Sequence, residues 1–328
     1  MADDAENPGQ RYQPEQTGMY ELEFPAPQLS SADGRGPVLI HALEGYSDAG
    51  RAIRLAAQHL KNTLDTELVA SFAIDELLDY RSRRPLMTFK TDHFTHYDEP
   101  ELNLYALHDS VGTPFLLLAG MEPDLRWERF ITAVRLLSER LGVRRVIGLG
   151  AIPMAVPHTR PITLTAHSND KELLTEHQPW MGEVQVPGSV SNLLEFRMAQ
   201  HGQEVVGFTV HIPHYLAQTD YPSAAETLLS EVARSGSLQI PTAALSQAAA
   251  EVHDKINEQV EASPEVAQVV EALERQYDAF VAAQENRSLL ARDEDLPSGD
   301  ELGAEFERFL AQQAGENDGD GPSDRPYT

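Results

Sequence analysis

Short apolar runs alternate with helical patterns between about residues 37 and 241, and no other feature of the sequence constrains the fold as strongly. The segments between the runs repeat apolar residues every three or four positions, as one face of a helix does. Strands that alternate with helices predict a mostly parallel sheet covered on both faces. The predicted strands are 37–43, 67–72, 114–120, 143–150, 162–166 and 204–211, and the predicted helices are 49–64, 125–141, 190–201 and 223–235.

We therefore expect a three-layer α/β domain over residues 37–241 and a C-terminal helical extension over residues 242–313. The strand patterns stop at the start of this extension, and helical spacing replaces them. Its second helix is predicted to begin at Ser263, where a capping residue precedes a proline. A third, short helix is predicted for 298–313, because Ser298 and Glu301 have the spacing of a capping box.

Both ends of the chain lack the apolar content of a folded core. Residues 1–36 are rich in proline and polar residues, so we expect mostly a flexible arm, interrupted by a weak extended patch at 19–24. Residues 314–328 are expected to form a disordered acidic tail.

The second helix of the extension carries apolar residues spaced by four, three, four and three positions, which is typical of a helix-pairing seam. Two interpretations stay open: the seam pairs with a second copy of the chain, or it packs back on the α/β domain. The residues of the seam are Val266, Val270, Leu273, Tyr277 and Phe280.

The formal net charge of −27 repels the phosphates of nucleic acids and of anionic lipids, so we expect neither nucleic acid nor a membrane as a partner. Residues 251–328 carry 20 acidic and 6 basic residues, which is about half of that excess. The absence of cysteine excludes disulfides, thiolate metal sites and a cysteine nucleophile. Because the first residues do not resemble a secretion signal, and no apolar run approaches the ~20 residues of a membrane span, we expect a cytoplasmic protein.

Polar side chains follow four of the predicted strands at the point where each strand ends. In an open parallel sheet, ligands bind beyond the carboxyl ends of the strands, where loops and helix N-termini converge. We therefore predict a candidate site at this rim of the sheet. Its members are Glu44, Ser47, Asp48, Glu122, Asp124, His158, Arg160, His211, His214 and Tyr215.

Each of these residues also has a structural interpretation. Ser47 and Asp48 precede a helix that they are expected to cap, and Glu122 and Asp124 precede another, where acidic residues favour the helix dipole. The arginines and acids of 75–85 are expected to form a self-neutralising surface or a subunit contact, although they could also clamp an anion.

Motifs for particular chemistries are weak or incomplete. The sequence GYSDAG has its second glycine one residue too late for a nucleophile elbow, which argues against a serine hydrolase. His211 and His214 are three apart, but Pro213 breaks any helix that would align them, so no metal site is predicted. The sequence contains neither a complete dinucleotide fingerprint nor a P-loop, so it identifies no cofactor.

Six ordered motifs between residues 37 and 241 resemble the proteasome assembly chaperone 2 family in its actinobacterial branch. The resemblance implies a fold similar to that of nucleoside phosphorylases and related hydrolases, and a tendency to form homo-oligomers, a trimer being one option. It implies no catalytic residue set. The motifs are EGYSDAG, DELLDYRSRRP, GMEPDLRW, GAIPMAVPHTRP, VPGSVSNLLEFR and HIPHYLAQTDYPSAA.

The sequence therefore leaves two functions open. The first is a homo-oligomeric binding or assembly scaffold, because eukaryotic members of the resembled family hold proteasome α subunits during assembly. Proteasome subunits are then candidate partners, and the chain end Pro326-Tyr327-Thr328 offers Tyr327 as a docking residue. The alternative is an enzyme acting on a small polar metabolite, with hydrolase, phosphorylase or ligase-like chemistry at the rim.

Overall fold

The computed structural model describes residues 18–23, 29, 34–175, 177 and 183–289. Residues up to Tyr277 belong to one compact unit, and those from Asp278 belong to a second. The predictions for the helix at 298–313, the tail at 314–328 and Tyr327 lie outside the described residues, as does most of the N-terminal arm. Among the described helices, none is long and apolar enough to cross a membrane.

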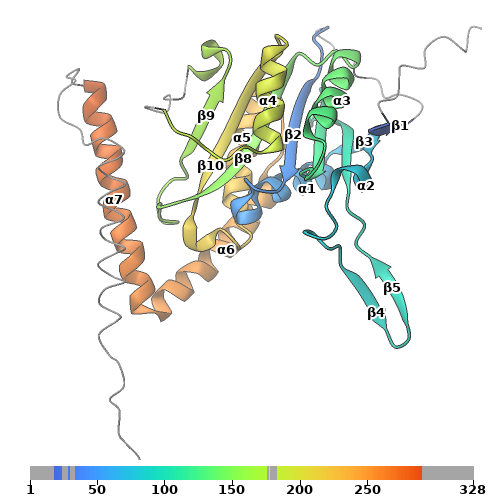
Figure 1. Ribbon diagram of the computed structural model, residues 1–328. Coiled ribbons are helices and arrows are strands. Elements are labelled where there is room, and N and C mark those ends of the chain that lie inside the picture. The colour runs from blue at the N-terminus through green and yellow to red at the C-terminus, as the bar shows by residue number, and fades with distance from the viewer. Residues whose placement is uncertain (1–17, 24–28, 30–33, 176, 178–182, 290–328) are drawn as a thin grey trace, which may run out of the picture. The chain divides into compact units, whose positions relative to one another are not determined.

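A sheet of eight strands forms the centre of the first unit (Figure 1). Its spatial order is β1-β3-β6-β7-β2-β8-β10-β9. Strand β2 pairs in parallel with β7 and β8, and β8 pairs in parallel with β10. The strands are β1 (Tyr20–Leu22), β2 (Val38–Glu44), β3 (Asp65–Phe72), β6 (Leu102–His108), β7 (Pro114–Met121), β8 (Arg145–Met154), β9 (Leu164–Ser168) and β10 (Glu204–Pro213).

The expected mostly parallel sheet is confirmed, with antiparallel pairing at both flanks. Strands β3, β7, β2, β8 and β10 run in one direction, whereas β1, β6 and β9 run in the other. The parallel strands at the centre are buried on both faces, as continuous apolar runs require. The weak extended patch at 19–24 contains β1, and Met19 beside it is fully buried.

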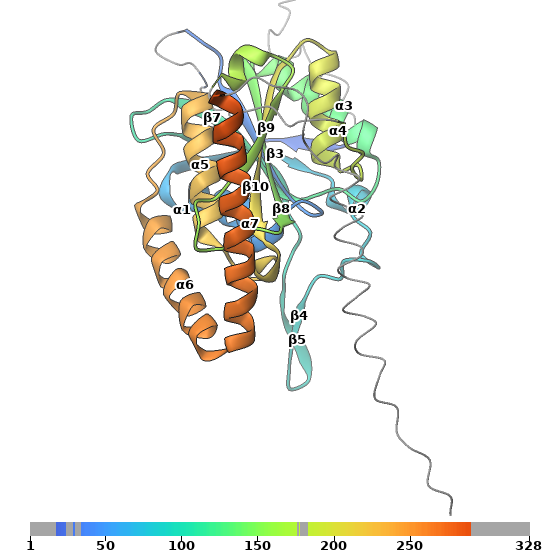
Figure 2. The ribbon, with the colours of Figure 1, turned by 90° about the vertical axis from the view of Figure 1, so that its left-hand side faces the viewer.

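Helices cover both faces of the sheet, so the three-layer α/β architecture is confirmed (Figure 2). One face packs against α1 (Ala52–Thr63) and α5 (Pro222–Gly236). The other packs against α3 (Trp127–Arg140) and α4 (Val190–Gln200). Each face has its own cluster of buried apolar side chains.

The helical extension begins with α6 (Ala243–Ala262) and continues as α7 (Pro264–Leu289). Helix α6 packs on α5 and buries Leu245 and Ile256 in the core of the α/β domain. In α7, Val270 and Leu273 are buried, and the Tyr277 hydroxyl donates a hydrogen bond of 3.0 Å to the Pro161 carbonyl. From Val270 to Tyr277, therefore, the seam packs back on the domain, whereas Val266 is 42% exposed.

Two features between β3 and β7 were not predicted. Strand β6 inserts between them and makes both of its pairings antiparallel. A separate two-stranded hairpin, β4 (Met87–Lys90) and β5 (His93–Tyr97), extends away from the large sheet (Figure 1). Every residue of its two strands is exposed, so the hairpin has no buried face and no apolar periodicity to indicate a core position.

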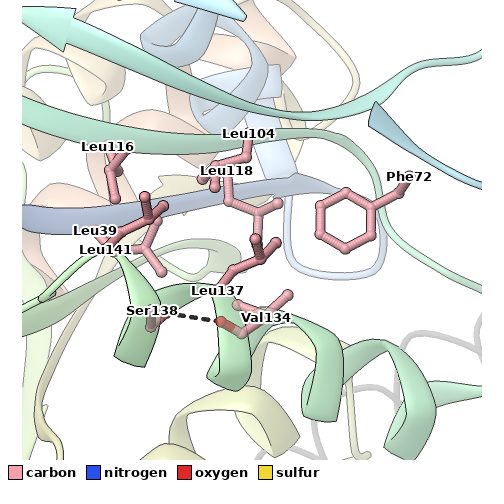
Figure 3. A pocket seen from close by; sticks show the side chains of 9 residues that line it. All are labelled: Leu39, Phe72, Leu104, Leu116, Leu118, Val134, Leu137, Ser138 and Leu141. Carbon is pink, nitrogen blue, oxygen red and sulfur yellow. Dashed lines mark hydrogen bonds between the residues drawn. The ribbon is translucent and has the colours of Figure 1, made fainter. Parts of the chain in front are cut away.

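The core on the α3 face is closely packed. The cavity found there has a volume of only about 10 Å³, near the minimum for one water molecule, and its lining is apolar (Figure 3). The one hydroxyl in the lining belongs to Ser138, which donates a hydrogen bond of 2.8 Å to the Val134 carbonyl. This cavity offers no room for a ligand.

A row of four residues crosses the α4 side of the sheet in register: His41, Gly148, Gly207 and His167, on β2, β8, β10 and β9. Glu195 of α4 lies over the two glycines. It bonds to His167 Nε2 on one side, and its Oε1 lies 3.1 Å from His41 Nε2 on the other. A Cβ on Gly148 would lie 1.9 Å from Glu195 Oε1, so the glycine makes room for the buried carboxylate.

We predict that Gly148→Ala destabilises the fold by about 1 to 3 kcal/mol or more, because the new methyl group overlaps Glu195 and His41. The free energy of unfolding in urea measures the effect. Gly188→Ala is the matched control, since a Cβ there meets nothing within 4 Å. Equal free energies of unfolding for the two variants would show that Glu195 and His41 do not fill the space beside Gly148.

The same row predicts a pH dependence of stability. Burial raises the pKa of Glu195, but the hydrogen bonds and charges of His167 and His41 outweigh burial and lower this pKa to about 2. Burial lowers the pKa of His167, but the hydrogen bond to Glu195 outweighs burial and raises this pKa above 6.5.

Stabilisation of the fold by Glu195 is therefore complete above pH 4.5 and is lost as the pH falls towards 2. Stabilisation by His167 is complete below pH 6.5 and is lost as the pH rises through the raised pKa.

Glu195→Gln should flatten both slopes in urea unfolding measured across this pH range. Glu204→Gln is the control, because Glu204 is a half-exposed carboxylate that pairs with Arg145 away from the row. A wild-type pH profile in Glu195→Gln would contradict the assignment.

Candidate functional site

The four central strands β7, β2, β8 and β10 are parallel neighbours, so their carboxyl ends share one edge of the sheet, drawn at the lower side of Figure 1. Backbone hydrogen bonds connect the segment after β2 to strand β8 and to the loop after β10. Ala151 N donates to Ser47 O at 2.7 Å, and Gly50 N donates to Ala217 O at 2.8 Å. The loops at this rim therefore form one connected layer.

Asp48 bonds to the first turn of helix α1, although the N-cap position of that helix belongs to Arg51. Its Oδ1 accepts a hydrogen bond of 2.7 Å from Ile53 N in the first turn. Burial raises the pKa of Asp48 to about 6, and the hydrogen bond from Ile53 N opposes this rise only in part. The nearby Glu44 carboxylate contributes to the increase, and its own pKa is raised by burial.

Glu122 joins the EGYSDAG loop to helix α4. Its Oε2 accepts a hydrogen bond of 2.9 Å from Tyr46 N, and its Oε1 accepts one of 2.7 Å from Val190 N at the start of the helix. The side chain is buried, and a Cβ on Gly45 would lie 2.1 Å from Oε2. Both oxygens of this carboxylate thus satisfy helix and loop N–H groups.

Asp124 is paired with Arg83. Its Oδ1 accepts from Arg83 Nε at 3.1 Å and also from Arg83 Nη2, while its Oδ2 accepts from Asp79 N at 2.8 Å. Arg83 Nη2 also donates to Glu122 O at 2.7 Å. Arg83 of the 75–85 segment therefore pairs with an acid outside that segment, and Glu76 of the segment pairs with Arg126.

A pocket of about 420 Å³ opens between these groups. Leu125 and Val186, which are close in sequence to residues of the lining, have exposed side chains. Tyr46, which forms part of the wall, is 67% exposed. Several polar side chains in the wall have partners: Arg83 pairs with Asp124, Glu122 accepts two N–H groups, and Ser189 Oγ accepts from Asn192 N at 3.1 Å and caps α4. The lining residues are Gly45, Tyr46, Arg83, Glu122, Pro123, Asp124, Trp127, Gly188 and Ser189.

The histidine side of the rim is covered by the helical extension. His158 is buried, its N–H donates to the Tyr215 oxygen at 2.9 Å, and its Nδ1 lies 2.7 Å from that oxygen. Its Nε2 lies 3.1 Å from Asn257 Oδ1 on α6. A tyrosine that donates to Nδ1 leaves the proton on Nε2, which is the neutral tautomer. Burial lowers the pKa of His158, which agrees with a neutral ring.

Arg160, His211 and His214 each contact another side chain of this chain. Arg160 Nη1 lies 3.3 Å from Glu274 Oε1 on α7. His211 is buried with its two nitrogens 2.8 and 3.0 Å from the hydroxyls of Thr163 and Thr165, and burial lowers its pKa. His214 is exposed, and its ring packs edge-on against Tyr215.

The predicted residues thus divide into two groups. Glu44, Ser47, Asp48, Glu122 and Asp124 lie with the loops after β2 and β7, and His158, Arg160, His211, His214 and Tyr215 lie with the loops around β8 and β10. Their role as one site stays a prediction. The sequence did not indicate that Trp127 and Ser189 line the pocket, or that Asn257 lies beside His158. Ser189 carried a signal as a helix cap, whereas Asn257 carried none.

We predict that Asp48→Asn stabilises the protein by about 1 to 3 kcal/mol at pH 7. The amide oxygen still accepts from Ile53 N, and the substitution removes the cost of ionising a buried group whose pKa is raised from 3.8 to about 6. The difference should shrink as the pH falls towards 4, because Asp48 is then protonated in the folded state.

Urea unfolding at the two pH values measures this effect. Asp124→Asn is the control and should lower stability, since it weakens the pair with Arg83. A loss of stability in Asp48→Asn at pH 7 would show that the ionised carboxylate is the favoured form.

Known proteins resemble the chain over most of its length. The sequence model of the PAC2 family matches residues 42–260. A Mycobacterium tuberculosis protein of unknown function is 79% identical, with a TM-score of 0.81 over 83% of this chain and 95% of that chain. A Corynebacterium glutamicum protein of unknown function is 46% identical, with a TM-score of 0.77 over 81% of this chain and 99% of that one.

A more distant structure shares the fold. A Mycobacterium tuberculosis proteasome-assembly chaperone homologue is 24% identical, with a TM-score of 0.66 over 71% of this chain and 99% of that chain. No curated protein matches the chain.

Proposed function

This chain belongs to the PAC2 family, and from that premise we propose that it is a homo-oligomeric scaffold that binds other proteins and assists their assembly. One observation carries the proposal: the chain exposes apolar side chains on the projecting hairpin β4–β5. Phe89 and Phe94 are 57% and 62% exposed, and Met87 beside them is 52% exposed. Clustered apolar surface of this kind is typical of protein–protein contacts.

The state of the rim supports binding over catalysis. An acid–base mechanism needs carboxylates or imidazoles that can reach a substrate. Here Asp48 and Glu122 accept backbone N–H groups, Asp124 pairs with Arg83, and His158 lies between Tyr215 and Asn257. Among the described rim residues, these contacts favour binding over the alternative of an enzyme acting on a small polar metabolite.

Proteasome subunits are the partners we propose, because they are the proteins that assembly chaperones of this family handle. Unassembled subunits expose the apolar surfaces that later form their ring contacts, and an aromatic hairpin is suited to cover such a surface. Tyr327 in the C-terminal tail is proposed as a second contact.

Co-elution of the purified full-length chain with separately purified, unassembled proteasome α subunits tests this proposal. We expect a stable complex with the full-length chain and weaker binding after removal of residues 314–328. Equal binding by both forms would remove Tyr327 from the proposal and leave the scaffold function in place. Absence of binding by both forms would contradict proteasome subunits as partners.

A further inference from the structure

We propose that residues 1–17 of this chain bind to its own rim pocket, with Tyr12 in the pocket and the acidic residues of the segment beside two arginines of the 75–85 segment. The rim pocket is the cavity of about 420 Å³ lined by Tyr46, Trp127 and their neighbours. The inference goes beyond the proposed scaffold function and does not depend on it, because it concerns a contact within one chain.

The rim pocket has the size and the walls of a site for an aromatic side chain. Its volume lies within the range of about 300 to 1,000 Å³ that is typical of ligand pockets. Tyr46 is 67% exposed, and Trp127 is half-buried, with its indole N–H donating to the Pro123 carbonyl at 2.8 Å. Aromatic-lined sites of this kind bind short extended segments, in which proline reduces the entropy lost on binding. The pocket therefore favours an extended peptide that contains an aromatic residue.

The segment 1–17 joins the fold at the same edge of the sheet as the pocket. Strand β3 runs in the same direction as β2, so Phe72 at its carboxyl end lies at the rim. Strand β1 is antiparallel to β3, which places Tyr20 at its amino end opposite Phe72 (Figure 1). Met19 is fully buried in the same apolar cluster against which Trp127 packs. Residues 1–17 are therefore attached to the fold at the rim.

Two hydrogen bonds and one helical turn link this point of attachment to the pocket. The residue before α2 (Ile74–Leu77) donates its N–H to Met19 O at 2.9 Å, and Asp124 N, in the pocket lining, donates to Leu77 O at 2.8 Å. Between these bonds, α2 spans about 6 Å at ~1.5 Å per residue. Tyr12 lies seven residues before Met19, and an extended chain of that length spans at most about 25 Å. Tyr12 can therefore reach the pocket of its own chain.

Charge favours this segment as the occupant. Residues 1–17 carry four acidic residues and one arginine, a side-chain charge of −3, together with one aromatic residue. In the pocket wall, Arg83 pairs with Asp124. Its sequence neighbours Arg81 and Arg84 are exposed and have no acidic partner within the described part of the chain. Acidic residues of the segment supply such partners, so the two surfaces are complementary in charge.

The fluorescence of Trp127 tests the proposal in the otherwise complete chain. Trp180→Phe leaves Trp127 as the only tryptophan, and a synthetic peptide of residues 1–17 is titrated into the protein. After removal of residues 1–17 the pocket is open, and we expect the peptide to change the emission of Trp127 in a saturable way. The full-length chain should bind the peptide about tenfold or more weakly, because its own tethered segment competes at an effective concentration in the millimolar range.

Point substitutions separate docking from other effects of truncation. In the full-length chain, Tyr12→Ser should open the pocket and give the peptide affinity of the truncated form, whereas the neighbouring Gln13→Ser should keep peptide binding weak. In the truncated form, Tyr46→Ser should abolish peptide binding. Phe196→Ser is its matched control, since Phe196 is an aromatic residue 56% exposed on α4 that does not line the pocket. Circular dichroism checks that these variants fold.

Removal of residues 314–328 is the matched control for the truncation, because this stretch also carries four acidic residues, one arginine and one tyrosine. Its removal should leave peptide binding weak. If it opens the pocket instead, the C-terminal tail is the occupant and the proposal is wrong. If dilution of the full-length chain opens the pocket, the segment comes from a second copy, and the proposal is wrong as well.

The inference is also overturned if the peptide fails to bind the truncated form, or if Tyr12→Ser leaves the pocket closed. None of these measurements involves proteasome subunits. The fluorescence experiment and the co-elution experiment can therefore fail independently of each other, which separates this inference from the scaffold function.

Discussion

The buried carboxylate of Glu122 holds the rim of this protein together. A charged group out of water is costly unless its oxygens are fully hydrogen-bonded, and here they accept N–H groups from the EGYSDAG loop and from the start of α4. One side chain at the end of β7 thereby fixes a loop that follows β2 and a helix that follows β9. Gly45 is required beside it, because any side chain there would occupy the position of the carboxylate.

Much of the architecture follows from the local pattern of residues. Strands such as β2 and β7 are apolar throughout because both of their faces are buried, and helices such as α1 show one apolar face. Strand β6 was missed although LNLYALH buries its residues in partial alternation, because a short half-buried strand gives a weak signal. The hairpin was missed for a different reason, since its apolar residues face solvent and follow no core periodicity.

The location of the rim could be predicted because parallel strands end at a common edge. The bonds within it could not, because they join segments far apart in the chain. Glu122 meets Val190, and His158 meets Asn257 only because the helical extension folds back over the loop after β8. The link between Asp48 and the helix that follows it could be predicted because that contact is local, although the N-cap position itself belongs to Arg51. Asp48, Glu122 and His158 form hydrogen bonds to loops and helices. The exposed apolar side chains of Phe89 and Phe94 lie on the hairpin, which was not predicted.

The strand order also determines how the chain can fold during synthesis. Strand β2 is the first of the central strands to be made, yet its neighbours β7 and β8 follow only at residues 114–121 and 145–154. At translation rates of about 5 to 20 residues per second, β2 waits roughly 5 to 20 seconds with its apolar residues unpaired. A nascent chain of this protein therefore carries an apolar strand without its sheet partners for seconds, which is long compared with the microseconds in which a β-hairpin forms.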